Sequence, residues 1–322
     1  MQQLTMFGPV AEDFNSVNAL IKDSLHSRVP LVSEIAAYLV NAGGKRLRPL
    51  LVLLAARGCG DASPEPVKLA VAIEFLHTAM LLHDDVVDES GLRRGRKTAN
   101  AEWGNAPSVL VGDFLHSRAF ELMVELGNLP VMSLISKATN GIAEGEVQQL
   151  THLQNPRMCE ADYLEVIYRK TALLFEVSAE SGAVLAGADA CAASGYRDYG
   201  RHLGLAFQLM DDLLDYDGNA ESLGKNLGDD LAEGKVTLPL IIALKRCNAS
   251  DRSTLEHAIL QPGSLDFETV RNITELSGAI EATRIKAMEE AERAMQALNV
   301  IEESDYKRTL HSLAEFAVQR SN

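Results

Sequence analysis

Long stretches without glycine or proline are the feature that most constrains this chain's fold. From Val67 to Asp88 neither residue occurs, which predicts one helix of 22 residues with an almost entirely apolar middle and the ending DDVVD. At ~1.5 Å per residue it would be roughly 33 Å long, enough to cross the centre of a domain. A chain that contains such a helix must wrap other apolar elements around it.

The rest of the sequence repeats this pattern. A second apolar helix is expected from about Tyr196 to Tyr216, and an amphipathic surface helix from Ala279 to Ala297. Glycine and proline gather at 58–66, 91–107, 127–130, 154–156, 218–234 and 262–263, which predicts loops there. Alternating β-branched residues are scarce, and no linker divides the chain. We therefore expect an all-α fold with residues 1–322 in a single domain.

The first long helix ends in a pair of aspartates. Asp84 and Asp88 are one turn apart on the same face, where like charges repel and partial burial raises the cost of ionisation. A divalent cation removes that conflict, and a few carboxylates plus water and phosphate are the ligands that Mg²⁺ prefers. A solvated helix end would also carry such acids, so the motif alone leaves both readings open.

Basic residues follow this motif at once. Arg93, Arg94, Arg96 and Lys97 lie within nine residues of Asp88, in GLRRGRK. Metal-binding acids beside phosphate-binding bases predict a diphosphate site.

A second DDxxD closes the second apolar helix, in FQLMDDLLDY. Gln208, Asp211 and Asp215 are expected on one face, and 211 − 84 gives a spacing of 127 residues between the two motifs. If the two helices face each other in a bundle, their carboxylates could hold metal ions between them.

Other basic residues could complete such a site. GGKRLRP supplies Lys45, Arg46 and Arg48 after a glycine pair, and Lys170 precedes Thr171 on another expected helix. GKNLGDDLAEGK brings Lys225 and Lys235 in a glycine-rich stretch suited to a lid. His77 lies seven residues before Asp84 and roughly 10 Å deeper on the same face.

Composition excludes several classes of function. With 30 Lys and Arg against 45 Asp and Glu, the net charge is −15, which disfavours nucleic acid as a partner. No secretory signal and no uninterrupted apolar run of about 18 residues is present, so we expect a cytoplasmic protein without a membrane span, although peripheral contact stays open. The four cysteines form no CxxC pair, so neither disulfides nor a zinc site are expected.

Together GGKRLRP, LLHDDVVDESGLRRG and FQLMDDLLDYDG followed by GKNLGDDLAEGKVTLP resemble the trans-polyprenyl diphosphate synthases, particularly the long-chain bacterial members that make octaprenyl or nonaprenyl diphosphate. The resemblance runs from about residue 30 to 245. It implies an isoprenoid synthase fold, a helical bundle around a deep central cavity, usually as a homodimer. It also implies a Mg²⁺-dependent transferase that condenses isopentenyl diphosphate onto an allylic diphosphate, with two or three ions bound alongside the diphosphate.

The resemblance implies a role for each matching residue. Asp84, Asp85, Asp88, Asp211 and Asp215 would bind Mg²⁺, with Asp85 the least certain of these matches; Arg93, Lys170, Lys225 and Lys235 would hold the allylic diphosphate; Lys45, Arg48, His77 and Arg94 would hold isopentenyl diphosphate. Thr171 and Gln208 would line the position where the allylic cation forms, and Lys170 belongs to the same catalytic group.

Product length should depend on where a side chain blocks the cavity. In the family, aromatic residues at the positions of Ala79 and Met80 accompany short products, and neither residue is aromatic here. The resemblance therefore implies about eight or nine isoprene units, an octaprenyl chain in the first instance, and a role in making quinone side chains. Met123, on the following helix, is a candidate floor residue, although it could equally be ordinary core.

Three other readings remain open. A class I terpene cyclase also ionises a diphosphate, but it typically has a different second metal motif. A noncatalytic synthase subunit commonly lacks intact aspartate motifs. An acidic helical scaffold would bind cations without needing a diphosphate. Shorter products, geranylgeranyl or farnesyl diphosphate, are the alternatives within the family.

Overall fold

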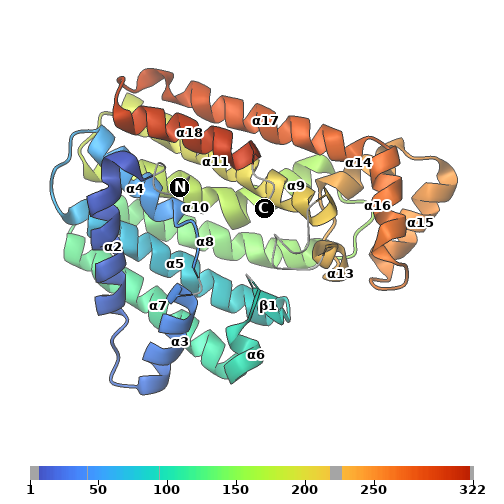
Figure 1. The fold of residues 1–322 in the computed structure, drawn as a ribbon, viewed down its shortest axis with the longest axis horizontal. Helices are drawn as coiled ribbons and strands as arrows, with labels where there is room; N and C mark the ends of the chain where they lie inside the picture. The colour runs from blue at the N-terminus through green and yellow to red at the C-terminus, as the bar shows by residue number, and fades with distance from the viewer. Residues whose placement is uncertain (1–6, 42, 94, 218–226, 320–322) are drawn as a thin grey trace. The chain divides into compact units, whose positions relative to one another are not determined.

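The computed structural model describes residues 7–41, 43–93, 95–217 and 227–319. Helices dominate it. The one sheet in the described residues consists of two antiparallel strands of two residues each, so the predicted all-α class is confirmed (Figure 1). The chain divides into two compact units, with 1–138, 174–200 and 297–313 in the first and 139–173, 201–296 and 314–322 in the second. The expectation of a single domain stays a prediction.

The first unit is built around the long apolar helix. Its elements are η1 (Gly8–Val10), α2 (Ala11–Ser24), α3 (Pro30–Asn41), α4 (Leu47–Gly58), α5 (Glu65–Val87), β1 (Leu92–Arg93), β2 (Arg96–Lys97), α6 (Ala99–Trp103), α7 (Asn105–Leu126) and η3 (Leu298–Val300). Helix α5 packs against α2, α4 and α7 (Figure 1). It starts two residues before the predicted Val67, with Pro66 in its first turn, where a missing N–H costs nothing.

The second unit contains α9 (Glu160–Ile167), the π-helical turn η2 (Tyr168–Ala172), α13 (Asp229–Ala232), α14 (Leu238–Arg246), α15 (Ala249–Leu260), α16 (Phe267–Leu276) and most of α17 (Ala279–Ala297). The boundary between the units falls within α8 (Leu129–His152), α11 (Ala190–Asp217) and α18 (Asp305–Gln319), and at the start of α10 (Leu173–Leu185). Helix α17 has the predicted bounds, with Ala287, Ala291 and Ala294 on its buried face.

Several boundary predictions are wrong, and two short ones are that α8 begins inside the predicted loop at 127–130 and that α13 lies inside the predicted loop at 218–234. Helix α11 begins at Ala190 rather than near Tyr196, because the Asp189 side chain accepts a hydrogen bond from the Ala192 N–H at 2.8 Å and caps an earlier start. The predicted loop at 91–107 contains β1, β2, α6 and the start of α7. Gly95, at φ +72°, turns the hairpin, and Pro107 sits in the first turn of α7, where helices tolerate proline.

Helix α5 is also the one helix among the described residues with the length and mean hydropathy of a membrane span. However, 67% of its most apolar stretch is buried inside the protein. A core helix has this property, so the expectation of no membrane span stays a prediction.

Candidate functional site

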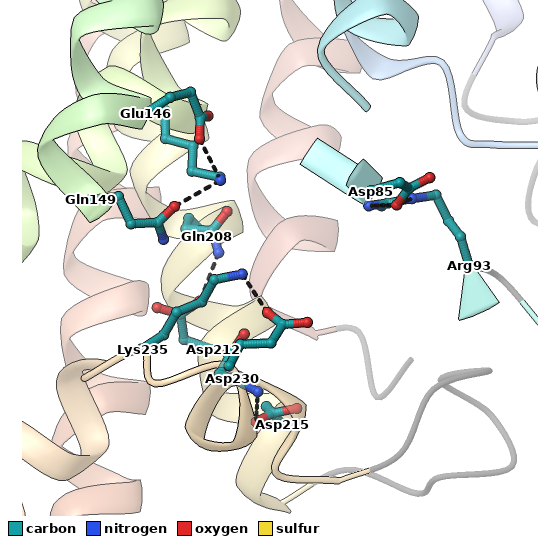
Figure 2. Close-up of polar contacts among 11 residues, drawn as sticks. Asp85, Arg93, Glu146, Gln149, Gln208, Asp212, Asp215, Asp230 and Lys235 are labelled. Atoms are coloured by element: carbon teal, nitrogen blue, oxygen red, sulfur yellow. Dashed lines mark hydrogen bonds and ion pairs between the residues drawn. The ribbon is translucent and has the colours of Figure 1, made fainter. Parts of the chain in front are cut away.

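The first aspartate motif lies where α5 ends. Asp84 and Asp88 are partly exposed, whereas Asp85 is fully buried. Arg93 donates to Asp85 Oδ1 from Nε at 2.7 Å and from Nη2 at 2.6 Å (Figure 2). Burial raises the pKa of Asp85 above its ordinary value, although the Arg93 guanidinium opposes that shift. The structure therefore pairs Asp85 with Arg93, two residues for which the sequence predicted separate roles.

A hairpin brings Arg93 back to the helix end, and two polar residues that sequence reasoning missed hold it. Thr98 Oγ1 donates to the Ser90 carbonyl at 2.6 Å, and Asn100 Nδ2 donates to the carbonyls of Asp85 and Ser90 at 3.0 and 3.2 Å. These bonds tie the hairpin to the end of α5 and to the residues that follow it. The sequence feature that could have identified Thr98 and Asn100 is their position as short polar residues directly after a basic turn.

The glycine-pair segment places Arg48 beside His77. Arg46, in the left-handed region at φ 47°, precedes the first residue of α4. Its side chain pairs with Glu74, whereas the Arg48 side chain contacts His77. Arg48 Nη1 lies 3.2 Å from His77 Nε2, and its guanidinium stacks on the Phe175 ring at 4.3 Å. The structure therefore brings together Arg48 and His77, two residues that the resemblance assigned to the same substrate. Arg94, which was predicted to join them, lies outside the described residues.

A pocket in the first unit is lined by several of the predicted site residues. His77, Asp85 and Arg93 line it together with Glu74, Arg96 and Lys97. Lys45 is partly buried just before α4. The pocket thus combines cationic and acidic side chains, as recognition of a phosphate group through a metal ion requires.

The second aspartate motif is more deeply buried than the first. Asp211 is partly exposed, but Asp212 is 3% exposed and Asp215 is fully buried, with its Oδ2 accepting from the Asp230 N–H at 3.3 Å. Sequence reasoning placed Gln208 with Asp211 and Asp215, whereas its amide hydrogen-bonds Asp212. Asp212 and Asp230 are both residues that the sequence did not single out.

Asp212 sits in a chain of four hydrogen-bonded side chains. Thr171 Oγ1 donates to Gln208 Oε1 at 2.8 Å, Gln208 Nε2 donates to Asp212 Oδ1 at 2.6 Å, and Tyr163 Oη donates to Asp212 Oδ2 at 2.6 Å. Burial, with the nearby charge of Asp230, raises the pKa of Asp212 to about 8. Burial also raises the pKa of Tyr163 well above its ordinary value, so its hydroxyl stays a donor.

Lys170 and Thr171 lie on the π-helical turn η2, a feature common at functional sites. Lys170 Nζ donates to Glu146 Oε2 at 2.7 Å and to Gln149 Oε1 at 2.8 Å, both on α8 (Figure 2). Lys235 donates to Glu233 at 2.5 Å (Figure 2). Its backbone N–H also bonds Asp230, so this part of the predicted lid forms a hydrogen-bonded turn. Lys225 lies outside the described residues.

A second pocket, within the second unit, is lined by Lys170, Thr171, Gln208, Asp212, Asp230 and Lys235. Apolar residues, including Met158, Val166 and Ile167, complete its wall. Charged groups able to hold a diphosphate therefore border an apolar surface.

The carboxylates fit a hard divalent cation. Asp85 Oδ2 is buried without a hydrogen-bond partner among the described residues, and carboxylate oxygen is the donor that Mg²⁺ prefers. Within the described ranges, no three His, Cys, Asp or Glu side chains gather closely enough to hold a metal by themselves. All four cysteines are free thiols.

The candidate chain-length residues are mostly internal. Ala79 and Met123 are each 1% exposed, on α5 and α7, and Met80 is partly exposed. These positions suit residues that shape an apolar interior, and their role in product length stays a prediction.

Known proteins resemble this chain over nearly its whole length. A family model described as polyprenyl synthetase matches residues 29–276. Octaprenyl diphosphate synthase of Haemophilus influenzae is 48% identical over 310 residues, covering 96% of this chain and 94% of that protein. All-trans-nonaprenyl-diphosphate synthase (geranyl-diphosphate specific) of Rhodobacter capsulatus is 46% identical, covering 98% and 97%.

A solved structure agrees with these matches. Polyprenyl synthase from Caulobacter crescentus, complexed with calcium and isoprenyl diphosphate, has a TM-score of 0.96 and 46% identity, covering 99% of this chain and 98% of that one. The resemblance inferred from the two aspartate motifs is thereby confirmed, and with it the isoprenoid synthase fold. Members of this family are Mg²⁺-dependent transferases that use isopentenyl and allylic diphosphates. Family model, relatives and fold agree, and the chain belongs to the polyprenyl synthetase family.

Proposed function

We propose that this chain condenses isopentenyl diphosphate units onto farnesyl or geranyl diphosphate and releases octaprenyl diphosphate. The observation that carries the proposal is the 48% identity to an octaprenyl diphosphate synthase over 96% of the chain. Long-chain trans-prenyltransferase activity is the function of this chain. The similarity to a nonaprenyl synthase, at 46% identity, favours nine units as the second candidate.

Two groups of basic residues would bind the two substrates. Arg48, stacked on Phe175 and next to His77, would bind isopentenyl diphosphate together with Lys45 and Arg94. In the second unit, Lys170 and Lys235 border one pocket and would hold the allylic diphosphate, together with Arg93 and Lys225. Arginine suits the first role because a guanidinium can donate two hydrogen bonds to one phosphate.

Carboxylates at the two helix ends would hold the metal ions. Asp84, Asp88, Asp211 and Asp215 are the proposed ligands, and Asp85 would add its Oδ2 while Oδ1 stays with Arg93. When bound, Mg²⁺ supplies the positive charge that neutralises the diphosphate as its bond to the allylic carbon breaks. We propose two or three ions.

Carbon–carbon bond formation needs no nucleophile from the protein. The allylic C–O bond breaks, the double bond of isopentenyl diphosphate attacks the cation, and a proton is then lost to the departing diphosphate. Thr171 and Gln208 line the pocket with oxygen atoms that can stabilise the cation. Val166 and Ile167 keep water, which would capture the cation, away from the same pocket.

Several finer features belong to this proposal. Small or unbranched side chains at Ala79 and Met80 leave room for a long product. Helix α7 exposes Leu110 (66%) and Val124 (65%), which supports a homodimer that would cover them. We further propose a cytoplasmic enzyme whose product becomes a quinone side chain.

The decisive experiment incubates the purified chain with farnesyl diphosphate, labelled isopentenyl diphosphate and Mg²⁺, with EDTA as the control. The products are dephosphorylated and resolved by length. A metal-dependent ladder that ends at eight units confirms the proposal, and one that ends at nine selects the second candidate. Consumption of farnesyl diphosphate without label incorporation would instead indicate a cyclase, and no reaction at all a noncatalytic subunit.

One variant separates the two binding roles. Arg48→Gln should raise KM for isopentenyl diphosphate at least about tenfold, because a charge-assisted bidentate contact is lost, and should leave KM for farnesyl diphosphate unchanged. Arg57→Gln is the matched control, because Arg57 also lies on α4 but pairs with Asp13. An equal rise in both KM values would contradict the assignment of Arg48.

A further inference from the structure

Both carboxylate oxygens of Asp212 are occupied by donors from the protein. Tyr163 Oη bonds one oxygen and Gln208 Nε2 the other, each at 2.6 Å. Asp212 is 3% exposed and Tyr163 2%. In contrast, Asp211, one residue earlier, is partly exposed. The middle aspartate of this motif is therefore directed into the protein rather than toward solvent.

Asp212 accepts a hydrogen bond at each of its two carboxylate oxygens, and this arrangement fixes the neighbouring amide. If the Gln208 amide flipped, its oxygen would face Asp212 Oδ1, and two acceptors would repel each other. The nitrogen of Gln208 must therefore face Asp212, which turns Oε1 toward Thr171. Thr171 has one hydroxyl hydrogen, and that hydrogen is committed to Gln208.

The result is a defined polarity at the pocket wall. Thr171 and Gln208 both line the pocket. Because one Gln208 amide hydrogen and the Thr171 hydroxyl hydrogen are used inside the chain of bonds, the Thr171 oxygen and the second lone pair of Gln208 Oε1 remain for the pocket. Lone pairs stabilise a developing cation, whereas N–H or O–H hydrogens in the same place would oppose it.

We propose that Asp212 and Tyr163 are positioning residues, which orient Gln208 and Thr171 so that their oxygens face the allylic cation. This inference rests on the proposed function, because it concerns the cation formed in that reaction. Asp212 thereby acts through Gln208 and Thr171 rather than as a direct metal ligand. Tyr163 holds the far oxygen of the carboxylate and so keeps the near one aligned with Gln208.

Asp212→Asn tests the orientation with little change in shape. An amide at position 212 can offer either its oxygen or its nitrogen to Gln208, so Gln208 and Thr171 lose their fixed polarity. We expect kcat to fall about 100-fold, the order found when one electrostatic contact to a transition state is removed, while KM for both substrates stays within about threefold.

A double variant should restore the polarity. In Asp212→Asn with Gln208→Glu, the new amide nitrogen donates to the new carboxylate, and that carboxylate again accepts the Thr171 hydrogen. The Tyr163 hydroxyl can still donate to the amide oxygen at position 212. We therefore expect kcat to recover at least about tenfold relative to Asp212→Asn. Loss of a metal ligand at position 212 would not be restored in this way, because the amide is still there.

Tyr163→Phe and a matched control complete the test. Removing the Tyr163 hydroxyl should lower kcat about three- to tenfold with unchanged KM, because the carboxylate stays but loses one of its two supports. Tyr199→Phe removes another fully buried tyrosine hydroxyl, which donates to the Leu310 carbonyl at 2.7 Å, and should leave kcat unchanged.

The outcomes distinguish this inference from the proposed function. If the wild-type chain shows no condensation, the proposed function fails. If the wild type is active and the double variant is no better than Asp212→Asn, the positioning role is overturned. If Asp212→Asn keeps more than about a third of the wild-type kcat, the role is likewise overturned, whatever the double variant does.

Discussion

Replacing Gly145 with alanine should damage catalysis more than stability. Gly145 is buried on α8 where that helix meets the π-helical turn η2. A Cβ atom at this position would lie 2.5 Å from Arg169 Cβ and 3.4 Å from both Arg169 C and Lys170 N. Carbon atoms in contact prefer about 3.5–4.0 Å, so the gap must open by about 1 Å.

The cost falls on the turn that carries Lys170 and Thr171. Arg169 Cβ is attached directly to the backbone, so relief requires η2 itself to shift. Overpacking of this kind costs about 1–3 kcal/mol, and alanine returns about 1 kcal/mol over glycine in a helix. The net loss of stability should be about 0–2 kcal/mol, whereas a misplacement of about 1 Å at reacting groups can cost about 100-fold in rate.

Gly141→Ala is the matched control, one turn earlier on the same helix. Its Cβ would meet Leu173 Cδ2 at 3.0 Å, the far end of a flexible side chain, and the turn can stay in place. Urea unfolding and kcat for isopentenyl diphosphate incorporation are measured for both variants. The reasoning is refuted if Gly145→Ala retains kcat within about threefold of wild type, or if Gly141→Ala loses as much.

Three further predictions concern charge and packing. Arg93→Gln should destabilise the metal-free chain by about 3 kcal/mol in urea unfolding, because it leaves the buried Asp85 carboxylate unpaired, and adding Asp85→Asn should recover most of this. Burial alone would raise the pKa of Glu290, but the hydrogen bond with His202 and nearby cations lower that pKa below its ordinary value. The stability that this carboxylate contributes is therefore present above about pH 4.5 and is lost as the pH falls through the depressed pKa. Glu290→Gln should therefore cost about 2 kcal/mol at pH 7 and progressively less below pH 4.5, and a pH-independent cost would contradict this. Met123→Ala should lengthen the product, and an unchanged product distribution would exclude Met123 as a floor residue.

Local pattern predicted the parts of the site that depend on one helix at a time. The absence of glycine and proline located α5 within two residues of its observed start, and the spacing of Asp84 and Asp88 located the exposed carboxylates at its end. His77 was placed on α5 in the same way. These properties follow from helical periodicity, which the sequence shows directly.

Contacts between distant segments could not be read from the sequence. Tyr163 and Asp212 are 49 residues apart, and nothing local to either marks the other as its partner. The hairpin was missed for another reason, since two-residue strands are too short to show alternation. In each case tertiary packing, rather than local propensity, decides the outcome.

The two aspartate motifs look like repeats, but the structure uses their middle residues differently. Successive residues on a helix are about 100° apart, so the aspartate after Asp84 or Asp211 must turn away from the face of its predecessor. Asp85 and Asp212 are accordingly buried, at 0% and 3% exposure.

Their partners differ in charge. Asp85 meets the guanidinium of Arg93, which compensates the buried charge, whereas Asp212 meets two neutral donors, which do not. A carboxylate held only by neutral donors keeps a higher pKa and depends on a hydrogen-bond donor at each oxygen. The amide of Gln208 must therefore turn its nitrogen toward Asp212. The first middle aspartate thus anchors a basic hairpin, and the second orders the polar wall of a pocket, although the two motifs have the same pattern.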